Sequence, residues 1–177
     1  MRIRSLAVAL AAAGIASLAT VSAEAGPRLS VDVDGAFPVT PSHTASGLGA
    51  DLRLGYELSL LIVSITPEVG AGYTGFSGDL APKAFRAFAG GRVSFGALLK
   101  PGIYGHVGYA HLGYDDFRGT VFNGRSAPTY DGGFTLDLTV LPKIDVGAHA
   151  GYTLIPSGDS QPALGWINAG LHVAVIF

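Results

Sequence analysis

The 177-residue chain contains no cysteine, so no disulfide framework holds it together. Charged residues are scarce, at 14% of the chain. After residue 25 there is no run of about eighteen apolar residues, which argues against a membrane-spanning helix in that part. The formal net charge is only −2, which predicts no nucleic-acid partner. Stability must therefore come from backbone pairing and packing.

Apolar character and glycine are plentiful by contrast. The mean hydropathy is +0.42 and the chain has 26 glycines. Only helices and closed barrels satisfy every backbone polar group in lipid. An apolar chain without a spanning helix therefore fits a membrane β-barrel.

The first 25 residues have the layout of a secretory signal peptide. Arg2 and Arg4 precede a short apolar stretch rich in alanine, residues 6–19, which leads to Ala23-Glu24-Ala25. This small-x-small pattern predicts cleavage after Ala25, with Ala23 as the second choice. The alternative, a membrane anchor, is disfavoured because the apolar stretch is short. We therefore expect a signal peptide at 1–25 and one barrel domain at 26–177.

Apolar and polar residues alternate with period two through most of the remaining chain, which is typical of strands. Eight such segments occur: 29–34, 48–58, 61–73, 85–95, 99–109, 133–140, 144–152 and 167–177. The links near 58–61, 96–99 and 141–144 are short, whereas those at 38–47, 74–84, 113–129 and 155–163 are longer. Short turns on one side and long loops on the other predict an all-β, eight-stranded antiparallel up-and-down transmembrane barrel.

The two faces of these segments differ in composition. One face is apolar and carries Tyr73, Tyr109 and Tyr152, which we expect in the outer aromatic girdle. The other carries mostly glycine, threonine, aspartate, arginine and histidine. A soluble lipocalin-like barrel is the alternative, with the apolar face inside, but 14% charge is too little for its water-facing surface. We therefore expect the apolar face outside, against lipid.

The stretch GIYGHVGYAHLGY, Gly102–Tyr114, and the terminal LHVAVIF ending at Phe177 resemble the small eight-stranded barrels of the OmpA transmembrane domain and OmpX type. The resemblance implies a bacterial outer-membrane protein in contact with lipid and lipopolysaccharide. It also implies that Phe177 is read by the outer-membrane assembly machinery. It says little about activity, because such barrels serve many functions.

No residue pattern predicts a catalytic or cofactor site. Gly70–Gly75 matches G-x-G-x-x-G, but a loop rather than a helix should follow, so we take it as a chance match. The deacylase type of barrel carries a His-x-Ser pair on one strand, and none occurs here. We expect a structural or surface-interaction protein, monomeric and not an enzyme. A lipid A-modifying enzyme and a narrow channel are the alternatives.

The polar face still holds groups with chemical potential. We expect its charges to pair inside the barrel: Asp32, Asp34, Asp51, Glu57, Glu68, Asp137, Asp145, Arg53, Arg86 and Arg92. His106, His149 and His172 lie on the same face, with His149 and His172 at similar heights. A three-histidine metal site is conceivable, but we expect neutral lumen residues that bind no metal. The longest loop, 113–129, mixes aromatic and charged residues and is the candidate contact for an extracellular ligand.

Overall fold

The computed structural model describes residues 24–41, 44–78, 82–115, 121–158 and 162–177. Its eight strands are β1 (Glu24–Thr40), β2 (Gly47–Leu60), β3 (Val63–Phe76), β4 (Pro82–Phe95), β5 (Leu99–Asp115), β6 (Val121–Leu141), β7 (Ile144–Ile155) and β8 (Leu164–Ile176). Each strand pairs antiparallel with its neighbours in the chain, and β8 pairs with β1 to close the barrel. The expected fold class is confirmed.

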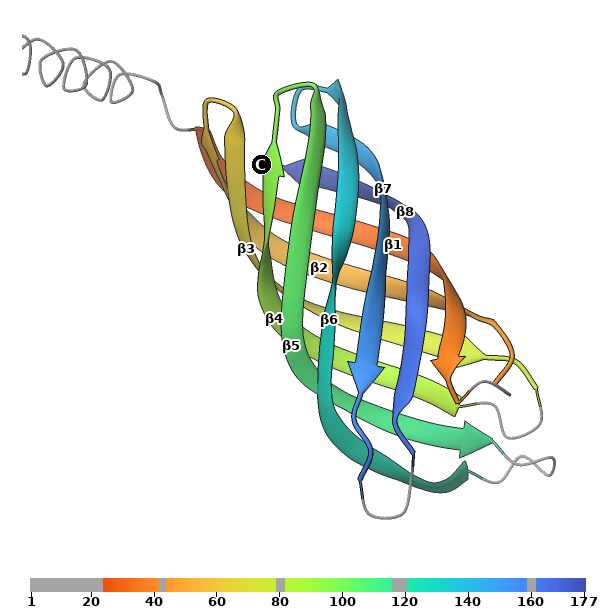
Figure 1. Ribbon diagram of the computed structural model, residues 1–177. Helices are drawn as coiled ribbons and strands as arrows, with labels where there is room; N and C mark the ends of the chain where they lie inside the picture. Colours follow the sequence, from red (N-terminus) through yellow and green to blue (C-terminus); the bar gives the residue numbers. More distant parts are fainter. Residues whose placement is uncertain (1–23, 42–43, 79–81, 116–120, 159–161) are drawn as a thin grey trace, which may run out of the picture.

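The barrel has two unlike ends (Figure 1). Three tight turns connect β2 to β3, β4 to β5 and β6 to β7 at one end, which we call the turn end. The start of β1 and the end of β8 lie at this end too. Leu61, Lys143 and Gly96 have φ values of 56°, 71° and 116° there, as tight hairpin turns require. The four longer connections lie at the opposite end, the loop end.

The apolar face of the strands lies outside and the polar face inside. Phe134 and Leu171 are 72% and 67% exposed, whereas Asp32, Arg92 and Asp137 are almost fully buried. Tyr73, Tyr109 and Tyr152 lie on the outer surface as expected. This distribution excludes the lipocalin-like alternative and is that of a membrane barrel. Within the described ranges, no helix has the length and apolarity to cross a membrane.

The strands extend beyond the predicted segments, and β1 and β6 do so furthest. β1 begins at Glu24, so that Glu24 and Ala25 already pair with Ser59 and Leu58 of β2. The rest of the predicted signal peptide lies outside the described residues, and cleavage after Ala25 stays a prediction. β6 begins at Val121, so the expected loop at 113–129 is wrong as a loop.

That error has a physical cause in the pairing of β5 with β6. Gly124 and Pro128 indicate a loop locally, but continuous pairing from Leu99↔Leu138 to Asp115↔Val121, interrupted by one irregularity beside Leu112, keeps the segment extended. Within 113–129, only residues 116–120 lie outside the described chain.

A charged lumen as the candidate functional site

The lumen is lined by every second residue of each strand, and inward glycines give the long side chains room. A Cβ on Gly147 would lie 2.6 Å from the imidazole of His172, and one on Gly72 would overlap the Asp51 carboxylate. Both positions therefore need glycine because a charged or polar side chain occupies the space beside the backbone.

Near the turn end, Arg28 joins three acidic side chains from three strands. Its guanidinium donates to Glu57 at 2.6 Å, to Asp145 at 2.8 Å and to Asp137 at 3.2 Å. Lys100 adds a second cation, with its Nζ 3.1 Å from Asp145. Each charge of this group is buried and has an opposite charge in contact, as the cost of desolvation demands.

Between this group and the turn end, the lumen opens into a cavity of about 390 Å³. Glu57, Lys100 and Asp145 line it, together with the last residues of the chain, Ile176 and Phe177. The ion pairs thus form the inner wall of a polar cavity at the turn end.

At mid-height, Arg53 and Glu68 lead to His106. Arg53 donates through Nε and Nη2 to both oxygens of Asp32, and lies 3.4 Å from Glu68. His106 contacts Glu68 through Nε2 at 2.7 Å and Asp131 through Nδ1 at 3.1 Å. A neutral imidazole has one N–H only. Two carboxylate contacts therefore favour a protonated His106, in contrast to the neutral ring that we expected from the sequence.

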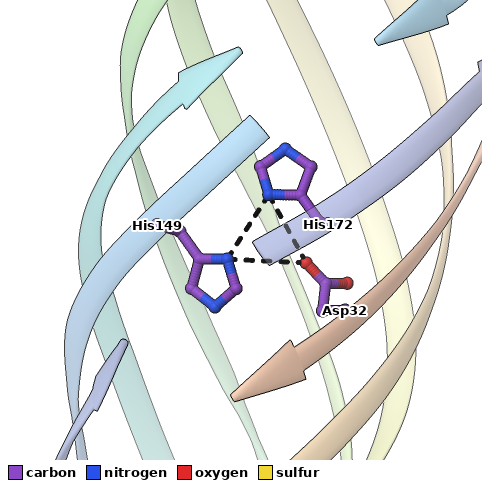
Figure 2. A group of neighbouring side chains, drawn as sticks. All are labelled: Asp32, His149 and His172. Carbon is purple, nitrogen blue, oxygen red and sulfur yellow. Dashed lines mark hydrogen bonds and ion pairs between the residues drawn. The ribbon is translucent and has the colours of Figure 1, made fainter. Parts of the chain in front are cut away.

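His149 and His172 meet beside Asp32, as Figure 2 shows. Their Nδ1 atoms are 3.4 Å apart, and each lies 3.8 Å from Oδ1 of Asp32. The expected match in height is thus confirmed. His106 is not part of this group, because the ring of Tyr104 lies between it and His149, with centroid distances of 5.3 and 6.4 Å.

Towards the loop end, Arg86 pairs with Asp51 and lies beneath an apolar layer. Its guanidinium is 3.1 Å from both Asp51 oxygens and 5.6 Å from the ring centroids of Phe88 and Trp166. Trp166 packs edge-on against Phe76 at 5.5 Å. The layer, which we call the apolar cap, consists of Ala36, Phe76, Ala84, Ala110, Leu112, Ala127, Ile155, Leu164 and Trp166. The lumen is therefore charged from the turn end to Arg86 and closed by apolar side chains towards the loop end.

Acids outnumber permanent cations in this lumen. Eight carboxylates face it among the described residues: Asp32, Asp34, Asp51, Glu57, Glu68, Asp131, Asp137 and Asp145. Five cations face them: Arg28, Arg53, Arg86, Arg92 and Lys100. Three histidines also each contact a carboxylate of this set.

The charges expected on the inner face from the sequence all lie there. The structure adds Lys100, which lies within the predicted strand 99–109, and also Arg28 and Asp131, which lie outside the predicted strands. Arg28 lies two residues before Ser30 and four before Asp32, and Asp131 lies two residues before Gly133. The same parity would have placed both inside, but the predicted strands began too late. Gly70–Gly75 lies within β3.

One polar pair lies on the outer surface near the loop end. Nδ1 of His111 on β5 is 3.0 Å from Oγ of Ser126 on β6, and both side chains are exposed. No carboxylate contacts His111 among the side chains that the structure describes. The pair has a nucleophile and a base but lacks an orienting acid in these ranges.

The β5–β6 hairpin is also braced at the loop end. Arg125, opposite Leu112, donates through Nη2 to the carbonyl oxygen of Pro162 at 3.0 Å and through Nη1 to that of Gly158 at 3.5 Å. The end of the hairpin is thus tied to the connection between β7 and β8.

Three solved structures share this architecture over nearly their whole length. Neisserial surface protein A is 16% identical, with a TM-score of 0.71 over 87% of this chain and 99% of that one. Ail of Yersinia pestis, solved with the heparin analogue sucrose octasulfate, is 12% identical with a TM-score of 0.59 over 87% and 99%. The outer membrane enzyme PagL is 19% identical with a TM-score of 0.55 over 82% and 98%.

No protein-family model and no curated protein matches the chain. The chain has the fold of the small eight-stranded outer-membrane β-barrels. The solved structures that share it differ in function, so the shared fold leaves the activity open.

Proposed function

We propose that this chain is a bacterial outer-membrane barrel whose role is structural or lies in surface contacts at the loop end, without catalysis. The filled lumen carries the proposal. Ion pairs occupy its middle and the apolar cap closes it towards the loops. With the interior occupied, the surface available to a partner is the outside of the molecule.

The outer membrane as its location is supported by three features. The apolar belt matches a lipid environment, the first 25 residues have the layout of an export signal, and the solved structures of this fold named above include Neisserial surface protein A and an outer membrane enzyme. Because short turns face the periplasm in outer-membrane barrels, we orient the turn end towards the periplasm and the loop end outwards. The outer aromatic girdle, with Tyr73, Tyr109 and Tyr152, then contacts lipid and lipopolysaccharide.

The contact surface that we propose is the end of the β5–β6 hairpin, within 113–129. β6 is 21 residues long, the longest strand, and Arg125 ties its upper part to the next connection. A braced hairpin loses less conformational entropy on binding than a free loop does. It therefore suits contact with an extracellular ligand.

A truncated hairpin tests this role. Replacing residues 113–124 by Asn-Gly joins Leu112 to Arg125, which are already paired, through a two-residue turn. Bacteria that display the wild-type barrel should attach to cultured epithelial cells, and the truncated barrel should lose most of that attachment. A Gly-Ser replacement of residues 79–81, in another connection at the same end, is the matched control. Equal attachment by all three barrels would contradict the proposal.

A second candidate function rests on the exposed His111–Ser126 pair. In an ester hydrolase, His111 would take the Ser126 hydroxyl proton as the oxygen attacks an acyl ester, and would then protonate the departing alcohol; water would release the acid. The outer surface near the loop end is where a lipid A ester would lie. Mass spectrometry of lipid A from expressing cells decides: loss of one acyl chain with the wild type but not with Ser126→Ala would replace the non-catalytic role.

A further inference from the structure

Three strands that close the barrel place nitrogen and oxygen donors around one point. His149 comes from β7, His172 from β8 and Asp32 from β1, and the pairing Asp32↔His172 sets two of them side by side. The three atoms that face one another are the two Nδ1 atoms and Oδ1 of Asp32. All three side chains are buried.

The outer nitrogen of each ring decides the state of the inner one. Nε2 of His172 is 2.7 Å from Oδ1 of Asp137, and Nε2 of His149 contacts Oδ1 of Asp34. An ionised carboxylate only accepts hydrogen bonds, so each Nε2 carries the proton. In a neutral ring Nδ1 is then a bare lone pair. Two lone pairs and a carboxylate oxygen consequently face one another with no donor between the two rings.

We propose that Asp32, His149 and His172 bind a divalent transition-metal ion of the zinc class. For a triangle with sides of 3.4, 3.8 and 3.8 Å, the point equidistant from the three corners lies about 2.1 Å from each, which matches zinc–nitrogen and zinc–oxygen bonds. Asp34 and Asp137 then take the place of the carboxylates that orient ligating histidines in metal sites. Two imidazoles disfavour calcium and magnesium, which prefer oxygen ligands.

The surroundings supply negative charge for the ion, and a small polar cavity adjoins it. The lumen has eight carboxylates against five permanent cations among the described residues, so a divalent cation offsets part of the excess. Arg53 donates to both oxygens of Asp32, including the Oδ1 that faces the two imidazoles. A cavity of about 10 Å³, room for one water, adjoins the site: Asp32, His149 and Asn168 line it together with Arg53 and His106, but His172 does not. Oδ1 of Asn168 is buried there without a hydrogen-bond partner.

The proposal goes beyond the surface role proposed above, and it replaces the expectation that these histidines bind no metal. His106 stays outside the site, because carboxylates already occupy both of its nitrogens. An ion held by β1, β7 and β8 links the first strand to the last two. It would stabilise the closed barrel over the open one, because the open chain lacks the assembled donors.

The test uses the full barrel, without a histidine tag, refolded in detergent with metal-free buffer and then dialysed against Zn²⁺. Elemental analysis should find one zinc per folded barrel. His149→Gln and His172→Gln should each lower retention at least tenfold. His106→Gln, the matched control within the same lumen, should retain zinc, and a heat-modifiable gel band should report folding in every variant.

X-ray absorption on the zinc-loaded wild type keeps the test decisive even where a variant fails to fold. Two imidazole ligands and an oxygen at zinc-like distances support the site. No retained zinc, or zinc with fewer than two imidazoles, overturns it. If no zinc is retained, a proton shared by the two Nδ1 atoms accounts for their short separation instead.

Discussion

Arg28 shows how much of the interior depends on one side chain. Its guanidinium contacts Glu57, Asp137 and Asp145, which come from β2, β6 and β7. Lysine could not reproduce this arrangement, because the planar fork of arginine presents several donors in fixed directions. Within the described part of the chain, Lys100 and Arg92 are the other lysine and arginine side chains that contact these acids.

Replacement of Arg28 should therefore weaken the barrel strongly. Arg28→Met leaves three buried carboxylates short of a shared cation, and we expect the free energy of unfolding to fall by about 3–5 kcal/mol. Denaturant titration of the detergent-folded protein measures it. Arg125→Met is the control: among the described residues, Arg125 donates to two backbone carbonyl oxygens and to no carboxylate, so its loss should cost about 1 kcal/mol. A cost for Arg28→Met no larger than for this control would refute the central role of Arg28.

Among the strands, β8 is the one that closes the barrel, because it pairs with the first strand, β1, as well as with β7. It contacts β7 and β1 along its length. At its end, the N–H of Phe177 donates to the carbonyl oxygen of Pro27 at 2.9 Å, and that of Ile176 to the carbonyl oxygen of Lys143 at 2.8 Å. The Phe177 side chain is 65% exposed on the outside.

Deletion of Phe177 should accordingly lower the amount of protein that reaches the outer membrane. The expectation follows from the exposed ring at the end of the terminal strand, which we take to be read by the assembly machinery. Heat-modifiable barrel in outer-membrane fractions is the measure, and Phe177→Tyr, which keeps an aromatic ring, should assemble normally. Unchanged amounts after the deletion would show that the ring is not read.

For the whole molecule, the alternating pattern predicted the strand number, the pairing order and the inner face, because a strand has a strict period of two. It did not predict which charges meet: Arg28 reaches Asp137 and Asp145 across the lumen, and such contacts depend on the stagger of all strands together. The apolar cap was missed because Phe76, Leu112 and Trp166 lie just beyond the predicted strands. Apolar residues on an inner face also contradicted the pattern used to find it.

The whole lumen should conduct ions poorly. Eight strands leave an interior just wide enough for side chains, and here two barriers follow one another, the ion pairs and the apolar cap. Purified protein in a planar bilayer should show no conductance or small flickering steps. Trp166→Ala or Arg92→Met alone removes part of one barrier, so steps should stay small, whereas the double variant should conduct more. Large, steady, weakly selective steps from the wild type would contradict the filled lumen.

Contacts between the first strand and the last strands join residues from opposite ends of the chain. Arg28 and Asp145 are 117 residues apart in sequence, and Asp34 and His149 are 115 apart. Contacts of such high order form late in folding, since a long loop must close before they contribute. Until β1 meets β8, the acids and bases of the interior face water on an open, curved sheet. Closure of the barrel therefore withdraws the polar face from solvent in a single late event. A barrel that has not closed stays hydrated and accessible to protease, whereas the closed barrel resists it.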